Sequence, residues 1–348
     1  MKTFLTTNQM MYTNRPTHVL RTWGLLLCIL SGMTVFFSAC KKQEETAPGL
    51  TTISQLISNG SRFTILKAAL TKSGMDATLN QAGTFTLFAP TDDAFKAFGY
   101  ADVAAINAAP AELLKSVLQY HVLSTRIGGA DIQTGVNNPQ QTMASAPVYI
   151  SKVTSASGTS TSTTSGTATI ISVNGARIVQ TDGAATNGVV HAIDRILLPP
   201  IFGDVVKTIQ GIPTLVPTAS FKLLQAAVTR AGSATSLSSA NAITVFAPTD
   251  AAFRAAGYDS TAIAKAPVAT LASVLGYHVL NGRTYTPLIS NGSSLTTLQG
   301  GTITATSSAT AVTVTGKGNG TSASNVTFPD ITATNGVVHI IDRLLLPQ

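Results

Sequence analysis

The sequence predicts an α+β fold built twice, with helices early and antiparallel strands late in each copy. Three observations support this: a repeated unit of about 150 residues, helical periodicity in the first half of each unit, and period-two segments rich in Thr, Val and Ile in the second half. Helices that precede a run of strands are typical of this class. With 348 residues, 44% hydrophobic and 11% charged, the chain can bury a core in each of two domains, which excludes disorder and a coiled coil.

Three motifs define the repeat, and each occurs twice in the same order. They are Phe-Ala-Pro-Thr-Asp at residues 88–92 and 246–250, Tyr-His-Val-Leu at 120–123 and 277–280, and Thr-Asn-Gly-Val-Val-His at 186–191 and 334–339. The copies differ in length mainly between the second and third motifs, so variable loops are expected there, because insertions are tolerated where the backbone is exposed. The predicted organisation is a leader over 1–39, a tether over 40–49, one domain over 50–200 and a second over 201–348.

The first half of each copy is predicted to be mainly helical. In the first copy the spacing of apolar residues predicts helices over 63–74 and 111–120, and a short strand over 85–88. The helix that follows this strand has Thr91 or Asp92 available as its N-cap. Capping also explains the carboxylates at this helix start without a catalytic or calcium-binding role.

The second half of each copy is predicted to be a run of strands, in the first copy 148–153, 169–173, 177–180 and 189–193. Asn174-Gly175 and Asn187-Gly188 predict tight turns, because Asn and Gly adopt positive φ at low steric cost. Most residues between 154 and 169 are Ser or Thr, and such a run is expected to be a flexible loop or hairpin tip.

The N-terminal segment is typical of an export signal. Basic residues without any acidic residue precede an apolar stretch over 23–37, which ends in Ser38-Ala39-Cys40. The stretch is shorter than the roughly 20 apolar residues of a spanning helix, which favours a cleaved signal peptide. Residues 37–40 resemble a bacterial lipobox, in which the cysteine is diacylated and begins the mature chain; the alternative is a secretory signal with an incidental cysteine. We expect Cys40 to be the membrane anchor.

The residues after Cys40 indicate where the protein would be displayed. The polar segment 41–48 is a short tether, and its Glu44-Glu45 pair resembles the surface-export signal of some bacterial lipoproteins. The expected localisation is the outer membrane with exposure at the cell surface, with a periplasm-facing anchor as the alternative. Because Cys28 and Cys40 are the two cysteines, both domains are expected to fold without a disulfide and to be insensitive to reductant.

The charge distribution argues against nucleic acid as a partner. The formal net charge is +7, and removal of the leader takes away three basic residues and no acidic one, which leaves about +4. The remaining basic residues are scattered and are not interleaved with aromatic residues in the way that a nucleic-acid surface requires.

The three ordered motifs, extended by Ile-Asp-Arg after the last of them, are similar to those of the fasciclin domain family. The resemblance covers residues 50 to 348, with every motif present in both copies. It implies a compact wedge of a β-sandwich packed with several helices, in tandem. It also implies a role in adhesion or extracellular binding, with no enzymatic activity.

The resemblance also suggests an adhesion surface. In animal relatives, cell-binding segments were assigned to an Asp-Ile pair before the Asn-Gly motif. The second copy has Asp330 and Ile331 at this place, after Pro329, and the first copy has Asp182 followed by Gly183. Asp330, Ile331 and Asp182 are therefore the candidate adhesion residues.

Four histidines fall in repeat pairs, and a structural role is predicted for each. The pairs are His121 with His278 and His191 with His339. A metal or general-base role is the alternative, but each follows apolar residues and no Cys, Glu or second His lies at ligand spacing. We expect them to hydrogen-bond buried backbone groups.

No sequence motif predicts an enzyme. The chain lacks the Gly-x-Ser-x-Gly motif of serine hydrolases, a phosphate-binding loop with Lys, and a dinucleotide fingerprint after a strand. No catalytic residue, cofactor or metal is therefore expected.

Two non-enzymatic functions remain open. In the first, the protein is a surface adhesin that binds an extracellular protein or glycan, or associates with its own kind. In the second, it is a glycan-handling or envelope-assembly accessory lipoprotein of the outer membrane. The single Trp of the chain is Trp23 in the leader, and its absence from the mature chain weakens the second function, because sugar platforms usually stack on aromatic side chains.

Overall fold

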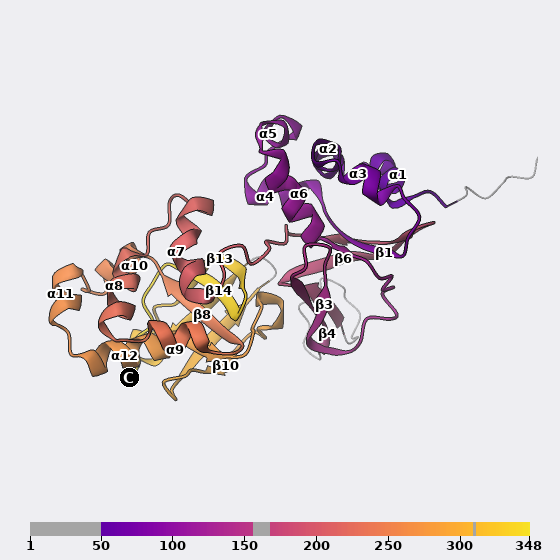
Figure 1. The fold of residues 1–348 in the computed structure, drawn as a ribbon. Coiled ribbons are helices and arrows are strands. Elements are labelled where there is room, and N and C mark those ends of the chain that lie inside the picture. The colour runs from indigo at the N-terminus through magenta and orange to yellow at the C-terminus, as the bar shows by residue number, and fades with distance from the viewer. Residues whose placement is uncertain (1–49, 156–167, 309–310) are drawn as a thin grey trace, which may run out of the picture. The chain divides into compact units, whose positions relative to one another are not determined.

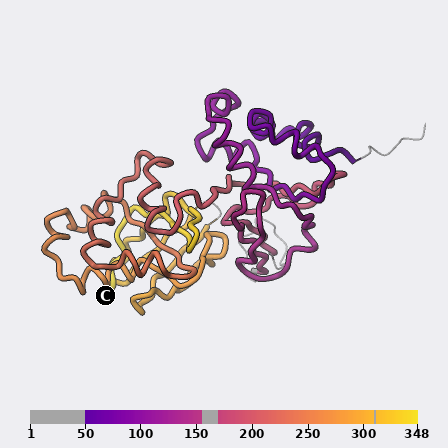
Figure 2. The backbone as a smooth tube through the Cα atoms, in the orientation of Figure 1, coloured from indigo at the N-terminus to yellow at the C-terminus, as the bar shows by residue number. Residues whose placement is uncertain are grey.

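The computed structural model describes residues 50–155, 168–308 and 311–348. The leader, Cys40 and its tether lie outside the described residues, as do residues 156–167 of the Ser/Thr-rich segment predicted as a loop. Residues 49–348 form one compact unit. Its backbone builds one sheet with helices from residues 50–200, here named domain 1, and a second from residues 201–348, named domain 2 (Figures 1 and 2). None of the helices in the described ranges combines the length and hydropathy needed to cross a bilayer.

Domain 1 contains six helices and seven strands among its described residues. The helices are α1 (Ile53–Asn59), α2 (Thr64–Ser73), α3 (Met75–Leu79), α4 (Asp92–Phe98), α5 (Val103–Ala108) and α6 (Ala111–Tyr120). The strands are β1 (Phe85–Pro90), β2 (Val122–Leu123), β3 (Gly135–Gln141), β4 (Pro147–Ser155), β5 (Ala168–Val173), β6 (Ala176–Ala185) and β7 (Gly188–Ile193). The predicted α+β class, with helices early and strands late, is confirmed.

The strands of domain 1 are hydrogen-bonded in the order β2-β1-β7-β6-β5-β4-β3. The expectation of antiparallel pairing holds for every pair but one, because β1 runs parallel to β7. Parallel neighbours need a long crossover between them. Here α4 to α6 and the strands β2 to β6 form this crossover between β1 and β7. The sequence pattern did not predict the parallel pairing, because a short apolar strand does not reveal its own direction.

Domain 2 repeats this arrangement in the order β10-β11-β12-β13-β14-β8-β9. Its helices are α7 (Val205–Leu215), α8 (Lys222–Arg230), α9 (Ala234–Ser239), α10 (Asp250–Ala255), α11 (Ser260–Lys265) and α12 (Val268–Tyr277), with 3₁₀ turns η1 (Thr286–Leu288) and η2 (Lys317–Asn319). Its strands are β8 (Ile243–Pro248), β9 (Val279–Asn281), β10 (Ser293–Thr296), β11 (Thr302–Ser307), β12 (Val312–Gly316), β13 (Ser324–Ala333) and β14 (Gly336–Ile341). Again β8 pairs parallel with β14.

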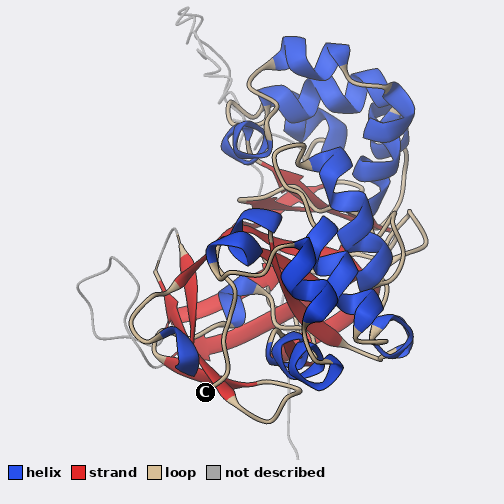
Figure 3. Ribbon diagram, turned by 90° about the vertical axis from the view of Figure 1, so that its left-hand side faces the viewer, coloured by secondary structure: helices blue, strands red, loops and turns tan. Residues whose placement is uncertain are grey.

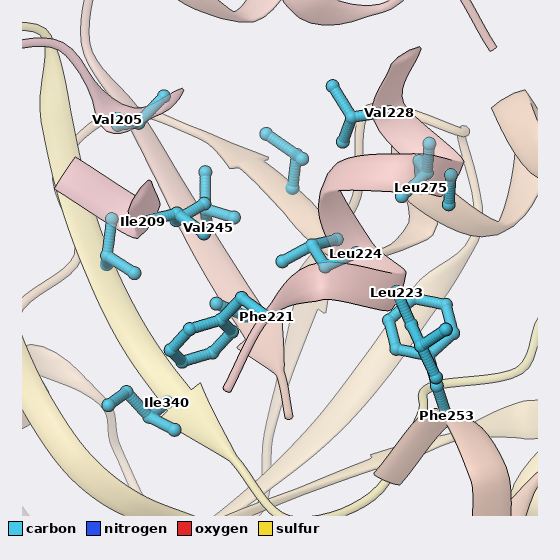
Figure 4. Packing of buried hydrophobic residues seen from close by; sticks show 14 of the residues in the cluster. Val205, Ile209, Phe221, Leu223, Leu224, Val228, Val245, Phe253, Leu275 and Ile340 are labelled. Carbon is cyan, nitrogen blue, oxygen red and sulfur yellow. The ribbon is translucent and has the colours of Figure 1, made fainter. Parts of the chain in front are cut away.

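Each domain has two apolar clusters, one between its helices and its sheet and one within the folded sheet. In domain 2 the first includes Phe221 and Leu224 around α8, which pack with Val245 of β8 and Ile340 of β14 (Figure 4). Figure 3 shows the helices gathered against the strands in this way. The second cluster is centred on Phe246, and its counterpart in domain 1 contains Phe88 and Tyr120. Burial of these side chains contributes about 25 cal/mol per Å² of apolar area.

The two Asn-Gly turns that the sequence predicts are built differently. Asn174 and Gly175 have φ of 44° and 83°, as a tight turn with positive φ requires. Asn187 and Gly188 do not have positive φ, which corrects the expectation for this pair. Gly188 is required for close packing instead, because a Cβ atom there would lie 2.1 Å from the carbonyl oxygen of Phe85 on the parallel strand.

The side chain of Asn187 joins three segments of domain 1. Its Oδ1 accepts a hydrogen bond from the N–H of Ile53 at 2.9 Å, and its Nδ2 donates to the carbonyl oxygens of Leu79 and Gln81. The N–H of Ile53 is an unpaired donor in the first turn of α1, so the asparagine satisfies a group that a helix start leaves free. Asn335 makes the same connections in domain 2, starting with the N–H of Val205 at 2.8 Å.

The helix starts after the Pro-Thr-Asp motif show a division of roles. Thr91 caps its own helix, because its hydroxyl accepts the N–H of Ala94. Asp92 instead accepts the N–H of Ile65 at 2.8 Å and so caps the start of α2. The sequence indicated Thr91 or Asp92 as the cap of a single helix, whereas the motif caps two. In domain 2, Asp250 likewise accepts the N–H of Leu223 at 2.8 Å.

Candidate functional site

The first histidine of each copy is a buried backbone connector. His121 is 0% exposed and His278 is 2% exposed. In each, Nδ1 lies 2.7 Å from the carbonyl oxygen four residues earlier, and Nε2 lies 2.9 Å from a backbone N–H near the end of the domain, that of Leu197 or Leu345. Nε2 therefore accepts and Nδ1 donates. Burial lowers the pKa of both imidazoles to about 4, so they are neutral at pH 7.

The second histidine of each copy has the opposite hydrogen-bonding pattern. Nδ1 of His191 accepts the N–H of Asp182 at 3.3 Å, and Nε2 donates to the carbonyl oxygen of Ile127 at 2.8 Å. In domain 2, His339 accepts the N–H of Asp330 at 3.0 Å and donates to a carbonyl oxygen at 2.9 Å. Burial lowers the pKa of both rings. Each of the four histidines thus bonds backbone through both ring nitrogens, which leaves neither nitrogen free for a metal.

Asp182 and Asp330, which the second histidines hold, have the same local geometry in the two copies. Their φ values are 62° and 65°, a region that non-glycine residues seldom adopt. Each carboxylate accepts one backbone N–H from the loop that follows the second strand of its domain, at 2.7 Å from Gly129 and at 2.8 Å from Thr286. The backbone therefore aims both carboxylates at the same place on their domains.

The surroundings of the two carboxylates differ. Oδ2 of Asp330 lies 2.5 Å from Nη1 of Arg195, which belongs to domain 1, and the hydroxyl of Thr286 also donates to it at 2.5 Å. The Asp330 side chain is only 4% exposed. Asp182 is exposed, and the hydrogen bond from Gly129 is the main cause that lowers the pKa of its carboxyl group.

These positions correct part of the expected adhesion surface. Asp330 is occupied by an ion pair between the domains, and Ile331 is 2% exposed in the apolar cluster of domain 2. The strand is irregular here, with a register shift between Phe328 and Ile331 and a positive φ at Asp330; the isoleucine is buried in the core while the aspartate meets domain 1. Ile331 is not displayed to an external ligand, and Asp330 borders only the cavity beside the junction. Of the three candidate residues, Asp182 is the one that lies exposed.

Further contacts at the junction of the domains were not indicated by any motif. The guanidinium of Arg283 lies over the ring of Tyr149, 4.3 Å from its centroid, and its carbonyl oxygen accepts a hydrogen bond from Asn137 at 2.7 Å. Tyr285, 1% exposed, donates to Oδ1 of Asn174 at 3.3 Å. A signal existed in the sequence, because the large aromatic residue Tyr285 has no counterpart in the first copy, which has glycine at the matching position, residue 128.

A cavity of about 290 Å³ lies beside this junction. Phe98 of α4 and Phe328 of β13 lie at its wall in an edge-to-face arrangement, with ring centroids 6.4 Å apart. Arg177, Arg195 and Asp330 contribute charged groups to its lining. Asp194, which neighbours both arginines, accepts the N–H of Arg177 at 2.7 Å, and burial raises the pKa of its carboxyl group. Within the described ranges, no cluster of three or more His, Cys, Asp or Glu side chains could hold a metal ion.

Two similar domains follow one another in the chain and meet at a polar and aromatic junction. The family model described as "Fasciclin domain" matches residues 61–199 and 219–347. The chain belongs to the fasciclin domain family, as its motifs predicted. Fasciclin domains are typically involved in cell adhesion.

Relatives of this chain come from animals and bacteria. Transforming growth factor-beta-induced protein ig-h3 of Sus scrofa is 29% identical over 277 residues, which cover 76% of this chain and 35% of that protein. Periostin of Homo sapiens is 26% identical over 278 residues, covering 76% of this chain and 29% of periostin. Protein sll1483 of Synechocystis is 30% identical over 165 residues, covering 47% of this chain and 82% of that protein.

The chain therefore spans about a third of the length of the ig-h3 protein. Among solved structures, a FAS1 domain pair from the insect cell adhesion molecule Fasciclin I is similar with a TM-score of 0.38 and 19% identity, over 84% of this chain and 95% of that chain.

Proposed function

We propose that this protein is a surface-anchored bacterial lipoprotein whose tandem fasciclin domains act as an adhesion and extracellular binding module. The observation that carries the proposal is the presence of two complete fasciclin domains in one compact unit, since this family is typically involved in adhesion. The lipobox-like residues before Cys40 support a lipid anchor. Each buried methylene of an acyl chain contributes about 0.8 kcal/mol, so two or more chains hold a protein stably on a membrane.

The exposed edge of domain 1 around Asp182 is the binding surface that we assign to this function. Its carboxylate is held by the N–H of Gly129 in a strained backbone conformation, with φ of 62°. Strained residues persist where the surrounding structure over-determines them, and they gather at functional positions. An ionised, rigidly aimed carboxylate suits a cationic group on an extracellular protein or glycan ligand.

Anchoring and display are tested with the full-length chain in a non-adherent bacterial host with an outer membrane. Cys40→Ala should release the protein from the membrane fraction, whereas the matched control Cys28→Ala should leave it there, because only Cys40 follows the small residues of the lipobox-like segment. Protease added to intact cells should digest the wild-type protein. Protection from the protease would place the anchored protein on the periplasmic side.

Adhesion is tested with the same cells on immobilised matrix proteins, glycans and cells of the parent bacterium. Wild-type cells should be retained on at least one surface, and Asp182→Asn should weaken the retention. Asp93→Asn is the matched control, because this aspartate is also in domain 1 and its side chain is 96% exposed. No retention above that of cells without the protein would overturn the adhesion function.

The cavity beside the junction favours a second function, that of a glycan-handling accessory of the envelope. The ring faces of Phe98 and Phe328 and the guanidinium of Arg177 provide an apolar and a polar side for a saccharide ring. Affinity electrophoresis against a polysaccharide panel tests it. Retardation that Phe98→Ala reduces and Asp182→Asn does not would support this function, and the absence of any retardation would remove it.

A further inference from the structure

We propose that the Asp182 edge of domain 1 binds the Arg343 end of domain 2 from a second copy of the chain, so that copies associate head to tail. The proposal deepens the adhesion function, on which it rests, by naming a partner for the same surface. It starts from the contact that the chain already makes with itself between Arg195 and Asp330.

The junction within the chain shows what this kind of surface receives. The end of domain 1 supplies Arg195, which follows β7, and the edge of domain 2 supplies Asp330. The carboxylate of Asp330 is oriented beforehand by the N–H of Thr286 at 2.8 Å, while its own N–H is held by His339. A carboxylate fixed in this way binds a guanidinium without losing much rotamer freedom.

Asp182 repeats the acceptor half of this contact, and its carboxylate is exposed. It has the same positive φ, the same N–H bond to a histidine and the same carboxylate bond to a loop N–H. No arginine of the described chain contacts it as Arg195 contacts Asp330. Arg126 favours the charged form of Asp182, but its guanidinium donates to the carbonyl oxygens of Ala185 and Gly188, and no ion pair joins it to Asp182 among the described residues. The carboxylate can therefore still pair with a guanidinium of a second molecule.

Arg343 occupies the place in domain 2 that Arg195 occupies in domain 1, so it can supply the guanidinium of a second contact of this kind. It follows Asp342 after β14 as Arg195 follows Asp194 after β7, and both aspartates accept a backbone N–H from the neighbouring strand at 2.7 Å. Arg343 is exposed, and in the described part of the chain its side chain makes one hydrogen bond, from Nε to the carbonyl oxygen of Ala323 at 3.3 Å. Its terminal nitrogens are therefore available to a carboxylate of another molecule.

The two ends of the molecule are different surfaces, so the contact is heterologous and extends into an open chain of copies. Domain 1 has Gly128 and Gln180 where domain 2 has Tyr285 and Phe328, so the contact between copies lacks the aromatic groups of the internal junction. It therefore buries less aromatic surface than that junction and is a weak, reversible contact. Salt weakens it, because both partners are exposed charges.

Sedimentation velocity of residues 49–348, the compact unit that contains all described cores, tests the proposal over roughly 5 to 500 µM. The weight-average sedimentation coefficient should rise with concentration. Asp182→Arg and Arg343→Asp should each weaken the association by about tenfold or more. Asp93→Arg and Arg254→Asp are exposed charge reversals elsewhere and should leave it unchanged.

Mixing the two variants gives the sharper test. Asp182→Arg retains a normal Arg343 and Arg343→Asp retains a normal Asp182, so an equimolar mixture should associate at concentrations at which neither variant associates alone. The double variant should regain association. An absence of association at the highest concentration, an association that neither reversal affects, or a symmetric dimer that stops at two copies would overturn the proposal. Circular dichroism checks that each variant is folded.

Cell adhesion separates this inference from the function on which it rests. Arg343→Asp should abolish self-association while cells that display it still adhere to matrix proteins or glycans, because their Asp182 is intact. If self-association occurs but no surface retains the cells, adhesion to other partners is overturned and the homotypic contact stands. If cells adhere but wild-type copies do not associate, only the homotypic contact is overturned.

Discussion

Domain 1 and domain 2 place an aspartate in the same strained conformation at the same edge, yet one aspartate is exposed and the other is covered. Asp330 lies beneath Arg195 of the preceding domain, whereas the carboxylate of Asp182 accepts hydrogen bonds from the N–H of Gly129 and the hydroxyl of Thr181 and faces solvent. The local backbone is the same in both, so the difference comes from what is brought against it. A motif that recurs in sequence can thus be an exposed edge in one copy and part of an internal junction in the other.

The groups that recur with the same hydrogen bonds form the scaffold of both domains. They include the two histidines, the asparagine of the Asn-Gly motif and the aspartate after Pro-Thr. The groups that differ, among them Tyr149, Tyr285 and Phe328, lie at the junction. The comparison therefore predicts that substitutions of the shared scaffold residues reduce the stability of the two domains by similar amounts. Substitutions of the two edge aspartates should reduce stability by different amounts.

The largest expected effect is a loss of stability in acid that both domains share. His121 and His278 have a pKa of about 4 when folded, below the ordinary value near 6.5 that the unfolded chain has, so the unfolded state binds more protons between these values. Their contribution is fully present above about pH 6.5 and is lost as the pH falls toward 4, at about 3 kcal/mol per histidine. Urea unfolding from pH 7.5 to 4.5, followed by circular dichroism, measures it.

The control for this prediction is His121→Gln, whose amide can both donate and accept a hydrogen bond but does not titrate. It should flatten the pH dependence of domain 1 while domain 2 keeps its own. Hydrogen exchange with mass spectrometry resolves the two domains. If only one domain lost protection in acid in the wild-type protein, the equivalence of the two scaffolds would be broken.

The next effect is expected from the asparagines that join three segments. Asn187→Ala leaves the N–H of Ile53 and two carbonyl oxygens without their partner, which should cost about 2 to 4 kcal/mol. Asn335→Ala should cost domain 2 a similar amount. Hydrogen exchange should accelerate around α1 and α3 in the first variant and around α7 and α9 in the second. Asn107→Ala, at an exposed helical position, should change stability by less than about 0.5 kcal/mol.

A smaller and unequal effect is expected at the two aspartates. Asp330→Asn should cost about 1 to 3 kcal/mol, because it removes the charge that faces Arg195 in a nearly buried site. Asp182→Asn should cost less than about 0.5 kcal/mol, since the side chain is exposed and Asn tolerates positive φ. Urea midpoints of the two variants give the difference. Equal losses would show that the ion pair between Arg195 and Asp330 adds nothing to the stability of the protein.

The smallest effect is expected from reductant. The two cysteines, Cys28 and Cys40, precede residue 49, so neither domain contains a thiol or a disulfide. Melting temperatures of residues 49–348 with and without dithiothreitol should agree within error for both domains. Because this fragment contains no cysteine, a shift would mean that dithiothreitol acts on the domains in another way than by reducing a disulfide.

Most of the secondary structure could be predicted from local patterns. The helices over 63–74 and 111–120, the strand at 85–88 and the turn at Asn174-Gly175 follow from periodicity and from residues with special φ preferences. The direction of β1 and the φ of Asn187 could not be predicted, because they depend on a strand about 100 residues away. For the same reason the sequence did not reveal that Asp92 caps α2.

The candidate site was predictable to a smaller extent. The equivalence of Asp182 and Asp330 follows from the repeat, and a backbone-bonding role for the histidines was predicted from their apolar surroundings. The different exposure of the two aspartates could not be predicted, because Asp330 is covered by Arg195 of the other domain. Tyr285, whose position in the first copy is a glycine, was the available signal of a specialised contact.

By itself the sequence determined the two-copy organisation, the α+β class and the fasciclin motifs, because these depend on the order and periodicity of nearby residues. Only the tertiary structure decided which copy of the aspartate is free. Exposure is a property of everything that packs against a group, and the arginine that covers Asp330 lies 135 residues before it in the chain. The identical backbone conformation at Asp182 and Asp330 is local, and the difference between them is entirely one of neighbours.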